Sequence, residues 1–344
     1  EVAIAQVISE LAQVPVDRLL MKDREALLRL EEQLSERVVG QPRAVDMISQ
    51  ALRRSAAGFR GARPLGTFLF AGPTGVGKTE MAKAISDLLF PGIAMTRIDM
   101  SELAQPHSVA RLLGAPPGYI GHDDGGQLTE AVRHRPYQLV LLDEIEKAHM
   151  EVLLSLLPLL DEGRLTDGRG RTVDFTNTVI VMTSNLGVET TEPRAKIGFG
   201  DAARSGSNDH ASKVLARVRS ALPPELWNRI DEPLCFLPLG ETELSQIARR
   251  MLAAVAVLAQ AKHGIQLTVD DSAIAHLLRS GGFDPQLGAR PMRRTVGRLV
   301  EAPLARALLA GEFESGDVVL VSERADTLEF TRKSATYDSD AYTA

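Results

Sequence analysis

The sequence predicts an α/β protein whose parallel sheet is flanked by helices, joined to a smaller α+β C-terminal domain. The first observation is the stretch PLGTFLFAGPTGVGKTE at 64–80, where a short apolar strand leads through a glycine-rich turn into a helix. The second is a set of further apolar strand patterns at 94–100, 138–144 and 177–185, with helical segments between them. Strands that alternate with helices pair in parallel and are covered on both faces, so these patterns favour a doubly covered sheet.

The 344-residue chain is long enough for two domains. We expect a helical linker at 1–35, a large ATPase domain at 36–237, a small C-terminal domain at 238–334 and a flexible tail at 335–344. In the small domain, helical patterns occupy 241–262 and 272–280, and strand patterns occupy 264–269, 317–323 and 327–332.

Two local expectations concern the large domain. Pro158 interrupts the apolar helical pattern VLLSLLPLL, which predicts a kink or an early stop there. The segment 189–212 is rich in Gly, Ser, Asp and Ala, which predicts a long exposed loop.

Composition excludes several classes of function. The formal net charge of −6 offers no basic excess for phosphate backbones, so we expect no nucleic-acid partner. No apolar run approaches the ~20 residues of a membrane span, so we expect no membrane partner. The single cysteine, Cys235, has apolar neighbours in PLCFLPL, which favours a core residue over a nucleophile. A chain without a possible internal disulfide suits a reducing compartment, and we expect a cytoplasmic location.

The stretch GPTGVGKT fills every position of the phosphate-binding pattern G-x-x-x-x-G-K-[ST], between a strand and a helix. Its glycines let backbone N–H groups surround phosphate oxygens, and the helix N-terminus adds a positive field. We expect Lys78 to reach the β- and γ-phosphates of ATP and Thr79 to ligate Mg²⁺. The predicted phosphate-binding residues are Gly72, Pro73, Thr74, Gly75, Val76, Gly77, Lys78 and Thr79.

Polar residues close two of the other apolar strands. Asp143 ends LVLLD and is expected to hold Mg²⁺, while Glu144 beside it is expected to polarise the attacking water. Asn185 ends VIVMTSN and could hold the same water, although asparagine is also common where strands pass into turns.

Longer motifs carry a family resemblance. GPTGVGKTE, GAPPGYIG, LLDEIEKAH, DEGRLTDGRGRTVDFTNTVIVMTSNLG, ELWNRID and GARPMRR occur in the order and spacing of the Clp ATPases. The match resembles the second ATPase module of ClpB, ClpC and ClpA and covers roughly 36–322. It implies an AAA+ fold, six-membered rings of identical subunits, and ATP and Mg²⁺ as cofactors. VISELAQVPVDRLL also looks like the linker that enters this module, which suggests an upstream part of the protein.

The resemblance assigns further site residues. It implies that Asn185 is sensor 1, that Arg290 in GAR is sensor 2, and that Arg229 in NRID is an arginine finger acting on the neighbouring subunit. Val38 and Val39 in RVVGQ match the adenine pocket, and Ile247 in QIARRML completes it. Without the resemblance, the arginines read as surface ion pairs and the valines as core packing.

The resemblance also assigns a use for ATP. GYIG matches the first pore loop, which implies that Tyr119 and Ile120 line an axial channel and grip unfolded or aggregated protein. TDGRGRT matches the second pore loop with Arg169 and Arg171, whose alternative is a solvated hairpin. Ile197, Gly198 and Phe199 in KIGFG resemble the element that docks ClpA and ClpC to the peptidase ring ClpP, which ClpB lacks.

We therefore predict an ATP-driven unfoldase that threads polypeptide through a hexameric pore and delivers it to a ClpP-type peptidase. The alternative within the family is a stand-alone disaggregase of the ClpB kind. A nucleotide-gated scaffold or a DNA-acting AAA+ ring is a third alternative, and Tyr119 and the acidic net charge disfavour the DNA-acting ring. A fourth is a module that stays monomeric and nearly inactive, because Arg229 would then lack a partner site.

Overall fold

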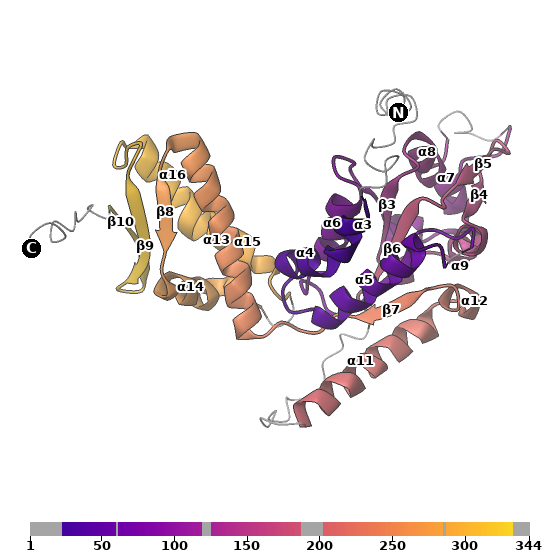
Figure 1. Ribbon diagram of the computed structural model, residues 1–344, viewed down its shortest axis with the longest axis horizontal. Coiled ribbons are helices and arrows are strands. Elements are labelled where there is room, and N and C mark those ends of the chain that lie inside the picture. The colour runs from indigo at the N-terminus through magenta and orange to yellow at the C-terminus, as the bar shows by residue number, and fades with distance from the viewer. Residues whose placement is uncertain (1–22, 60, 119–124, 187–201, 285–286, 333–344) are drawn as a thin grey trace, which may run out of the picture. The chain divides into compact units, whose positions relative to one another are not determined.

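The computed structural model describes residues 23–59, 61–118, 125–186, 202–284 and 287–332 (Figure 1). The chain divides into two compact units, Glu1–Leu237 and Pro238–Ala344. We call them the large unit and the small unit and describe each by itself.

The large unit is built on a five-stranded sheet in the order β2-β3-β6-β1-β7. Its strands are β1 (Gly66–Ala71), β2 (Thr96–Asp99), β3 (Gln138–Asp143), β6 (Thr178–Ser184) and β7 (Glu232–Cys235). Every neighbouring pair in this sheet runs parallel. The predicted α/β class with a parallel sheet flanked by helices is confirmed.

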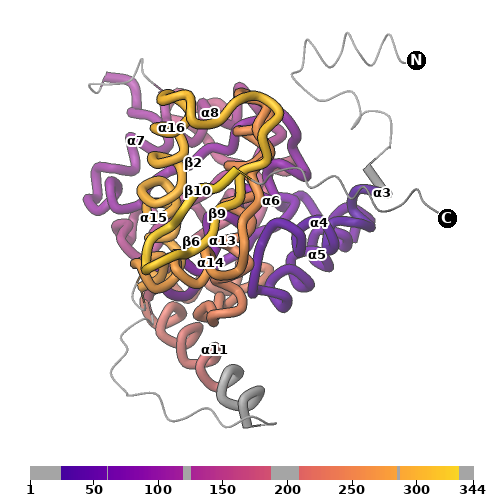
Figure 2. The backbone as a smooth tube through the Cα atoms, turned by 90° about the vertical axis from the view of Figure 1, so that its left-hand side faces the viewer, coloured from indigo at the N-terminus to yellow at the C-terminus, as the bar shows by residue number. Residues whose placement is uncertain are grey.

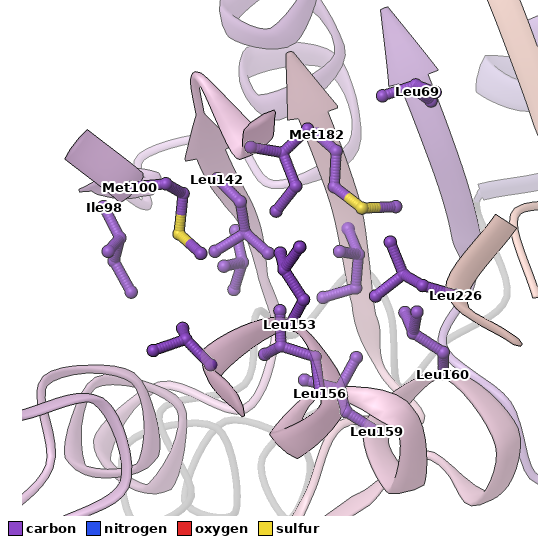
Figure 3. Packing of buried hydrophobic residues seen from close by; sticks show 14 of the residues in the cluster. Leu69, Ile98, Met100, Leu142, Leu153, Leu156, Leu159, Leu160, Met182 and Leu226 are labelled. Atoms are coloured by element: carbon purple, nitrogen blue, oxygen red, sulfur yellow. The ribbon is translucent and has the colours of Figure 1, made fainter. Parts of the chain in front are cut away.

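The central strands are buried on both faces because alternate residues enter two different cores. Phe68 and Phe70 of β1 pack with the apolar sides of α4 (Leu30–Arg37), α5 (Pro42–Ala56) and α6 (Lys78–Leu89). Leu69 and Ala71 enter the opposite core, in which Leu142, Leu153, Leu156 and Met182 meet (Figure 3). Full burial of one such side chain contributes about 1.5–3 kcal/mol. The two cores together hold the C-terminal ends of the strands in fixed register.

The remaining elements of the large unit connect these strands. They are α3 (Asp23–Leu28), α7 (Val109–Leu113), α8 (Gln127–His134), α9 (Met150–Ser155), α10 (Leu157–Glu162), α11 (Ala202–Ala221), α12 (Pro224–Trp227) and the antiparallel hairpin of β4 (Arg164–Thr166) and β5 (Thr172–Asp174). Short 3₁₀ turns lie at Met100–Leu103, Pro106–Ser108 and Ile145–Lys147.

Two local expectations can be compared with this chain trace. The helix around Pro158 does break, at Leu156, and the proline occupies the first turn of α10, where a missing N–H costs no helical bond. The expectation of a loop across 189–212 is wrong for residues 202–212, which form the first half of α11. Val214 and Val218 of the second half of α11, and Leu222 just after its end, are buried in the core, so packing supports the C-terminal half of this helix.

The small unit has a three-stranded sheet in the order β10-β9-β8, covered by helices. Strands β8 (Gln266–Val269) and β9 (Val318–Arg324) are parallel, whereas β9 and β10 (Thr327–Arg332) form an antiparallel hairpin (Figure 2). Its helices are α13 (Glu241–His263), α14 (Asp271–Leu277), α15 (Arg290–Val296) and α16 (Ala302–Leu309), with π-helical turns at Leu278–Gly282 and Gly297–Glu301. The mixed sheet confirms the predicted α+β character.

The helical run from α15 to α16 was missed by the sequence patterns. Pro291 and Pro303 resemble helix breakers, but each lies in the first turn of its helix. Met292, Val296, Val300 and Leu304 then bury the inner side of the run. Among the helices described in either unit, none is both long and apolar enough to cross a bilayer.

Candidate nucleotide site

The glycine-rich loop lies between the end of β1 and the start of α6. Gly72, Gly75 and Gly77 have φ angles of 141°, 76° and 103°, a region that residues with a Cβ rarely enter. A Cβ added at Gly72 would also lie 2.4 Å from the carbonyl oxygen of Phe236. The sequence therefore permits a tight backbone turn at the N-terminus of α6, where N–H groups can meet an anion.

The Lys78 side chain crosses this loop and reaches the neighbouring strand. The residue is buried, and Nζ donates to the carbonyl oxygens of Gly72 at 2.6 Å and Pro73 at 2.8 Å. Nζ also donates to Asn185 Oδ1 at 2.8 Å. A cation is thus held at the mouth of the loop, where phosphate oxygens could replace the carbonyls as its acceptors. Thr79 follows it in α6 and is half-buried.

Asp143 lies at the C-terminal end of β3 and is held by two partners. Thr183 on β6 donates its hydroxyl to Asp143 Oδ1, and Arg97 on β2 donates Nη2 to Oδ2 at 2.5 Å. Neither partner was expected from the sequence. Strand register brings them in, since β2 and β6 flank β3 in the sheet.

Glu144, the next residue, has a φ of 57°, an uncommon value for a residue with a side chain. Its N–H donates to Thr183 Oγ1 at 3.1 Å, which helps to fix this turn. Its Oε1 accepts from Asn185 Nδ2 at 3.0 Å. The turn thus directs the Glu144 carboxylate toward Asn185 at the end of β6, whereas Asp143 is the last residue of β3 and contacts the neighbouring strands.

Asn185 joins these groups. It accepts from Lys78, donates to Glu144, and uses its backbone N–H to reach Glu146 Oε1 at 3.0 Å. A cation, an amide and a carboxylate therefore form one continuous chain across three segments of the large unit. This is an arrangement that can place a water molecule between a general base and a phosphate.

The donor set suits Mg²⁺, which takes hard oxygen ligands and keeps several waters. Thr79 offers a hydroxyl and Asp143 a carboxylate, in keeping with their predicted roles. Asp143 Oδ2 is shared with Arg97, whose side chain is more than half exposed and free to turn toward solvent. The residues present therefore fit the ion.

Val38 and Val39, predicted for the adenine pocket, are both buried. Val38 packs in the core under α6, and its Cγ1 would lie 3.8 Å from a Cβ at Gly77, so it closely adjoins the phosphate loop. The sequence interpretation missed Gln41 beside them. Its amide donates to the carbonyl oxygens of Val76 at 3.3 Å and of Leu237 at 2.9 Å, which ties the loop to the end of the large unit.

Arg290 and Ile247 belong to the small unit. Arg290 is exposed at the first position of α15, and Ile247 is half-buried on α13. Their predicted roles at the nucleotide remain predictions.

Arg229, the predicted arginine finger, follows α12 and is joined to its own subunit. Nε donates to Asp161 Oδ2, and Nη1 donates to the carbonyl oxygen of Glu225 at 2.6 Å. Among the described residues, Arg229 therefore has an ion pair within its own chain, and none of its side-chain hydrogen bonds reaches Lys78, Glu144 or Asn185.

The segment predicted as the second pore loop forms the turn between β4 and β5. Asp167 accepts from the backbone N–H groups of Arg169 at 2.9 Å and Arg171 at 2.8 Å, and the Arg171 guanidinium binds both Asp167 and Glu130. Burial opposes ionisation of Asp167, but the hydrogen bonds from Arg171 and Arg169 outweigh it and lower its pKa. Hydrogen bonds from Arg133 and Arg171 lower the pKa of Glu130. These contacts make Arg171 part of the hairpin structure, and the predicted contact of Arg169 and Arg171 with substrate stays a prediction.

Several predicted residues lie outside the described ranges, namely Tyr119, Ile120, Ile197, Gly198 and Phe199. Cys235 lies at the end of β7, and burial raises the pKa of its thiol, an environment that disfavours the reactive thiolate.

Comparison with known families agrees with this geometry. Residues 63–233 match the family model described as AAA domain (Cdc48 subfamily), and residues 239–321 match the C-terminal, D2-small domain, of ClpB protein. The fold and the phosphate loop together define a AAA+ ATPase, and the enzyme class predicted from the sequence is confirmed.

Curated relatives narrow the class. The chain is 49% identical over 333 residues to the chaperone protein ClpB of Rhodopseudomonas palustris, covering 96% of this chain and 37% of that protein. It is 48% identical over 321 residues to the chaperone protein ClpB of Vibrio cholerae, covering 93% of this chain and 36% of that protein. The chain thus spans little more than a third of the length of these relatives. It belongs to the Clp-type AAA+ ATPases and corresponds to their second ATPase module.

Proposed function

We propose that this module hydrolyses ATP between neighbouring subunits of a hexameric ring and uses the energy to thread polypeptide through the ring. The observation that carries the hydrolytic part is the hydrogen-bonded chain from Lys78 through Asn185 to Glu144. The matches to a AAA domain and to ClpB relatives support the same interpretation.

In this mechanism the phosphates bind at the N-terminus of α6, on the loop N–H groups and Lys78. Thr79 and Asp143 would hold Mg²⁺, which neutralises charge on the β- and γ-phosphates when it is bound. Glu144 takes a proton from the attacking water, and Asn185 keeps the carboxylate and the water aligned. Val38, Val39 and Ile247 are proposed to contact the adenine base of ATP, and Arg290 is proposed to contact its γ-phosphate.

Arg229 is proposed to act on the nucleotide of the adjacent subunit. Arg229 makes no hydrogen bond to Lys78, Asn185 or Glu144 among the described residues, which does not suit a role in its own nucleotide site. A target on the phosphate of a neighbouring subunit would account for this arrangement. An arginine supplied in this way is worth about 10³-fold or more in rate. Hydrolysis would then depend on assembly.

The substrate is proposed to be unfolded or aggregated protein, gripped in the channel by Tyr119 and Ile120, with Arg169 near the substrate path. The relatives from Rhodopseudomonas palustris and Vibrio cholerae are named chaperone proteins, which favours the stand-alone disaggregase over delivery to a peptidase. We propose a cytoplasmic location, consistent with a chain that has a single cysteine.

The test of threading is Tyr119→Ala, with Phe59→Ala as the matched control because Phe59 is an aromatic side chain that is 86% exposed elsewhere on the large unit. Tyr119→Ala should keep ATP hydrolysis and lose the unfolding of a fluorescent reporter protein that carries an unstructured tail. Undiminished unfolding by this variant would contradict the threading proposal.

Delivery to a peptidase is the second candidate, and the sequence Ile197-Gly198-Phe199 is what favours it. The test is retention of a ClpP-type peptidase ring on immobilised Glu144→Gln protein in the presence of ATP. Retention that is abolished by Phe199→Ala would establish this candidate, and absence of retention would leave the disaggregase.

A further inference from the structure

Arg63 lies where three segments of the large unit meet. Its Nε donates to the carbonyl oxygen of Leu160 at 2.8 Å, and Nη1 donates to Asp231 Oδ1 at 3.1 Å. Its Nη2 donates to the backbone carbonyl oxygen of Arg229 at 2.6 Å. Every nitrogen of the Arg63 guanidinium thus has an acceptor. One acceptor is at Leu160, and the other two belong to Arg229 and Asp231 in the Arg229 segment.

Each acceptor of Arg63 belongs to Arg229 itself or lies close to it or to its ion-pair partner in the sequence. Leu160 precedes Asp161, the carboxylate that holds Arg229 Nε. Asp231 lies two residues after Arg229, and its other oxygen accepts from the N–H of Thr67 at the start of β1 at 2.9 Å. Arg63 therefore connects the backbone of Arg229 to α10 on one side and to β1 on the other.

Arg63 is far from the nucleotide site of its own subunit. It precedes β1, whereas the phosphate loop follows the end of β1, and a strand of this length, Gly66–Ala71, extends about 20 Å. A change at Arg63 should therefore affect the position of Arg229 more than the binding of ATP by Lys78.

The chemistry of arginine explains why this residue stands here. The planar guanidinium presents donors in several fixed directions, whereas a lysine ammonium is a compact charge on a flexible stem. Three acceptors in different directions, one at Leu160 and two in the 229–231 segment, need the planar guanidinium. The Arg63 side chain is only 33% exposed, so its hydrogen bonds are partly shielded from water.

We infer that Arg63 is a positioning residue for Arg229: it fixes the backbone from which the arginine side chain reaches the phosphate of the neighbouring subunit. This inference rests on the proposed role of Arg229. Loss of Arg63 should misplace the Arg229 guanidinium, and misplacement by ~1 Å can cost on the order of 100-fold in rate.

The first experiment measures ATP hydrolysis and nucleotide affinity of the full chain. Arg63→Ala should lower the rate by about 10- to 100-fold while a fluorescent ATP analogue binds with unchanged affinity. Arg63→Lys should fall between Arg63→Ala and the parent chain. The control is Arg54→Ala. Arg54 and Arg63 both line one surface hollow, but among the described residues the Arg54 guanidinium pairs with Glu232 alone, at 2.8 Å, and its side chain is 59% exposed. Arg54→Ala should change the rate less than twofold.

The second experiment asks in which subunit the defect acts. In rings mixed from the two variants Arg63→Ala and Glu144→Gln, an Arg63→Ala subunit supplies an intact Glu144. When its neighbour is a Glu144→Gln subunit, that neighbour supplies a correctly held Arg229, and the site between them is complete. In a random equal mixture such complete sites are about a quarter of all sites, so the mixture should hydrolyse ATP faster than either parent ring. A defect confined to the fold of the Arg63→Ala subunit would give no such gain. If Arg63→Ala does not fold, Arg63→Lys takes its place in the same mixture.

Arg229→Ala mixed with Glu144→Gln is the reference. A gain in both mixtures supports the positioning role of Arg63. A gain with Arg229→Ala alone overturns that role and leaves the proposed function of Arg229 intact. No gain in either mixture overturns action on the neighbouring subunit, and the inference on Arg63 falls with it.

Discussion

Asn185 and Glu144 are joined by a hydrogen bond of 3.0 Å from the Asn185 amide nitrogen to Glu144 Oε1. The same amide group accepts from Lys78 through its oxygen, at 2.8 Å. An amide suits this position, because its planar end offers a donor and an acceptor side by side. The relationship therefore links the proposed general base to the cation of the phosphate loop.

Asn185→Ala should break this link and slow ATP hydrolysis by about 10- to 100-fold, since the base loses its alignment with the water. Nucleotide affinity should change little, because Lys78 keeps its loop carbonyls until phosphate replaces them. Steady-state hydrolysis and binding of a fluorescent ATP analogue measure the two effects. Gln50→Ala is the control, since Gln50 is an exposed amide whose side chain donates, within the described part of the chain, to Asp46 on the same helix α5. An Asn185→Ala rate equal to that of the control would remove Asn185 from the mechanism.

The part of the site that the sequence could predict is the part encoded by neighbouring residues. The glycines and Lys78 lie within one loop, and Asp143 and Glu144 are adjacent at a strand end, so their spacing alone identifies them. Thr183 and Arg97 could not be found in this way. They reach Asp143 only through the parallel register of β6 and β2, which a single sequence does not specify.

The fold shows the same division. The strand patterns predicted the parallel sheet because buried parallel strands are continuous apolar runs. The helical pattern of α15 and α16 was hidden by Pro291 and Pro303, and the first half of α11 by its polar composition. For α15 and α16, packing of Met292, Val296 and Leu304 against the rest of the small unit decided the outcome, and local propensity did not.

Gly72→Ala should destabilise the large unit and weaken nucleotide binding together. The added Cβ would meet the Phe236 carbonyl oxygen at 2.4 Å at a φ of 141°. Gly58→Ala is the control, because Gly58 also has a positive φ, 83°, but nothing lies within 4 Å of its Cβ position. Backbone strain alone should cost about 1–2 kcal/mol in the control, and the collision should add to it at Gly72. Urea unfolding without ATP measures the loss of stability, and unfolding with ATP measures the loss of nucleotide binding. Equal losses in Gly72→Ala and Gly58→Ala would mean that the loop relaxes around the added Cβ without further cost.

The hairpin that carries Arg169 and Arg171 should lose stability in acid. Asp167 has its pKa lowered below the ordinary 3.8, so folding favours its ionised form. Its contribution is therefore complete above the unfolded pKa and disappears as the pH falls through the lower folded pKa. Asp167→Asn should be less stable than the parent chain at neutral pH, and the difference should shrink as the pH falls below about 4. A difference that is constant from neutral to acid pH would show that charge plays no part in it.

Asp161→Asn tests whether the ion pair with Arg229 restrains the arginine before a neighbour arrives. Asp161 is 42% exposed and Arg229 29%, so the pair is partly screened by water and its loss should shift the equilibrium by at most about fivefold. In the proposed ring, the γ-phosphate of the adjacent subunit would compete with Asp161 for the same guanidinium. Replacing the carboxylate by an amide removes the charge and keeps the shape, so half-maximal hydrolysis should be reached at a lower concentration of chain. Hydrolysis measured against chain concentration gives this midpoint. A rate that instead collapses to that of Arg229→Ala at every concentration would show that Asp161 orients the arginine for reaction, since a mere competitor cannot be required for it.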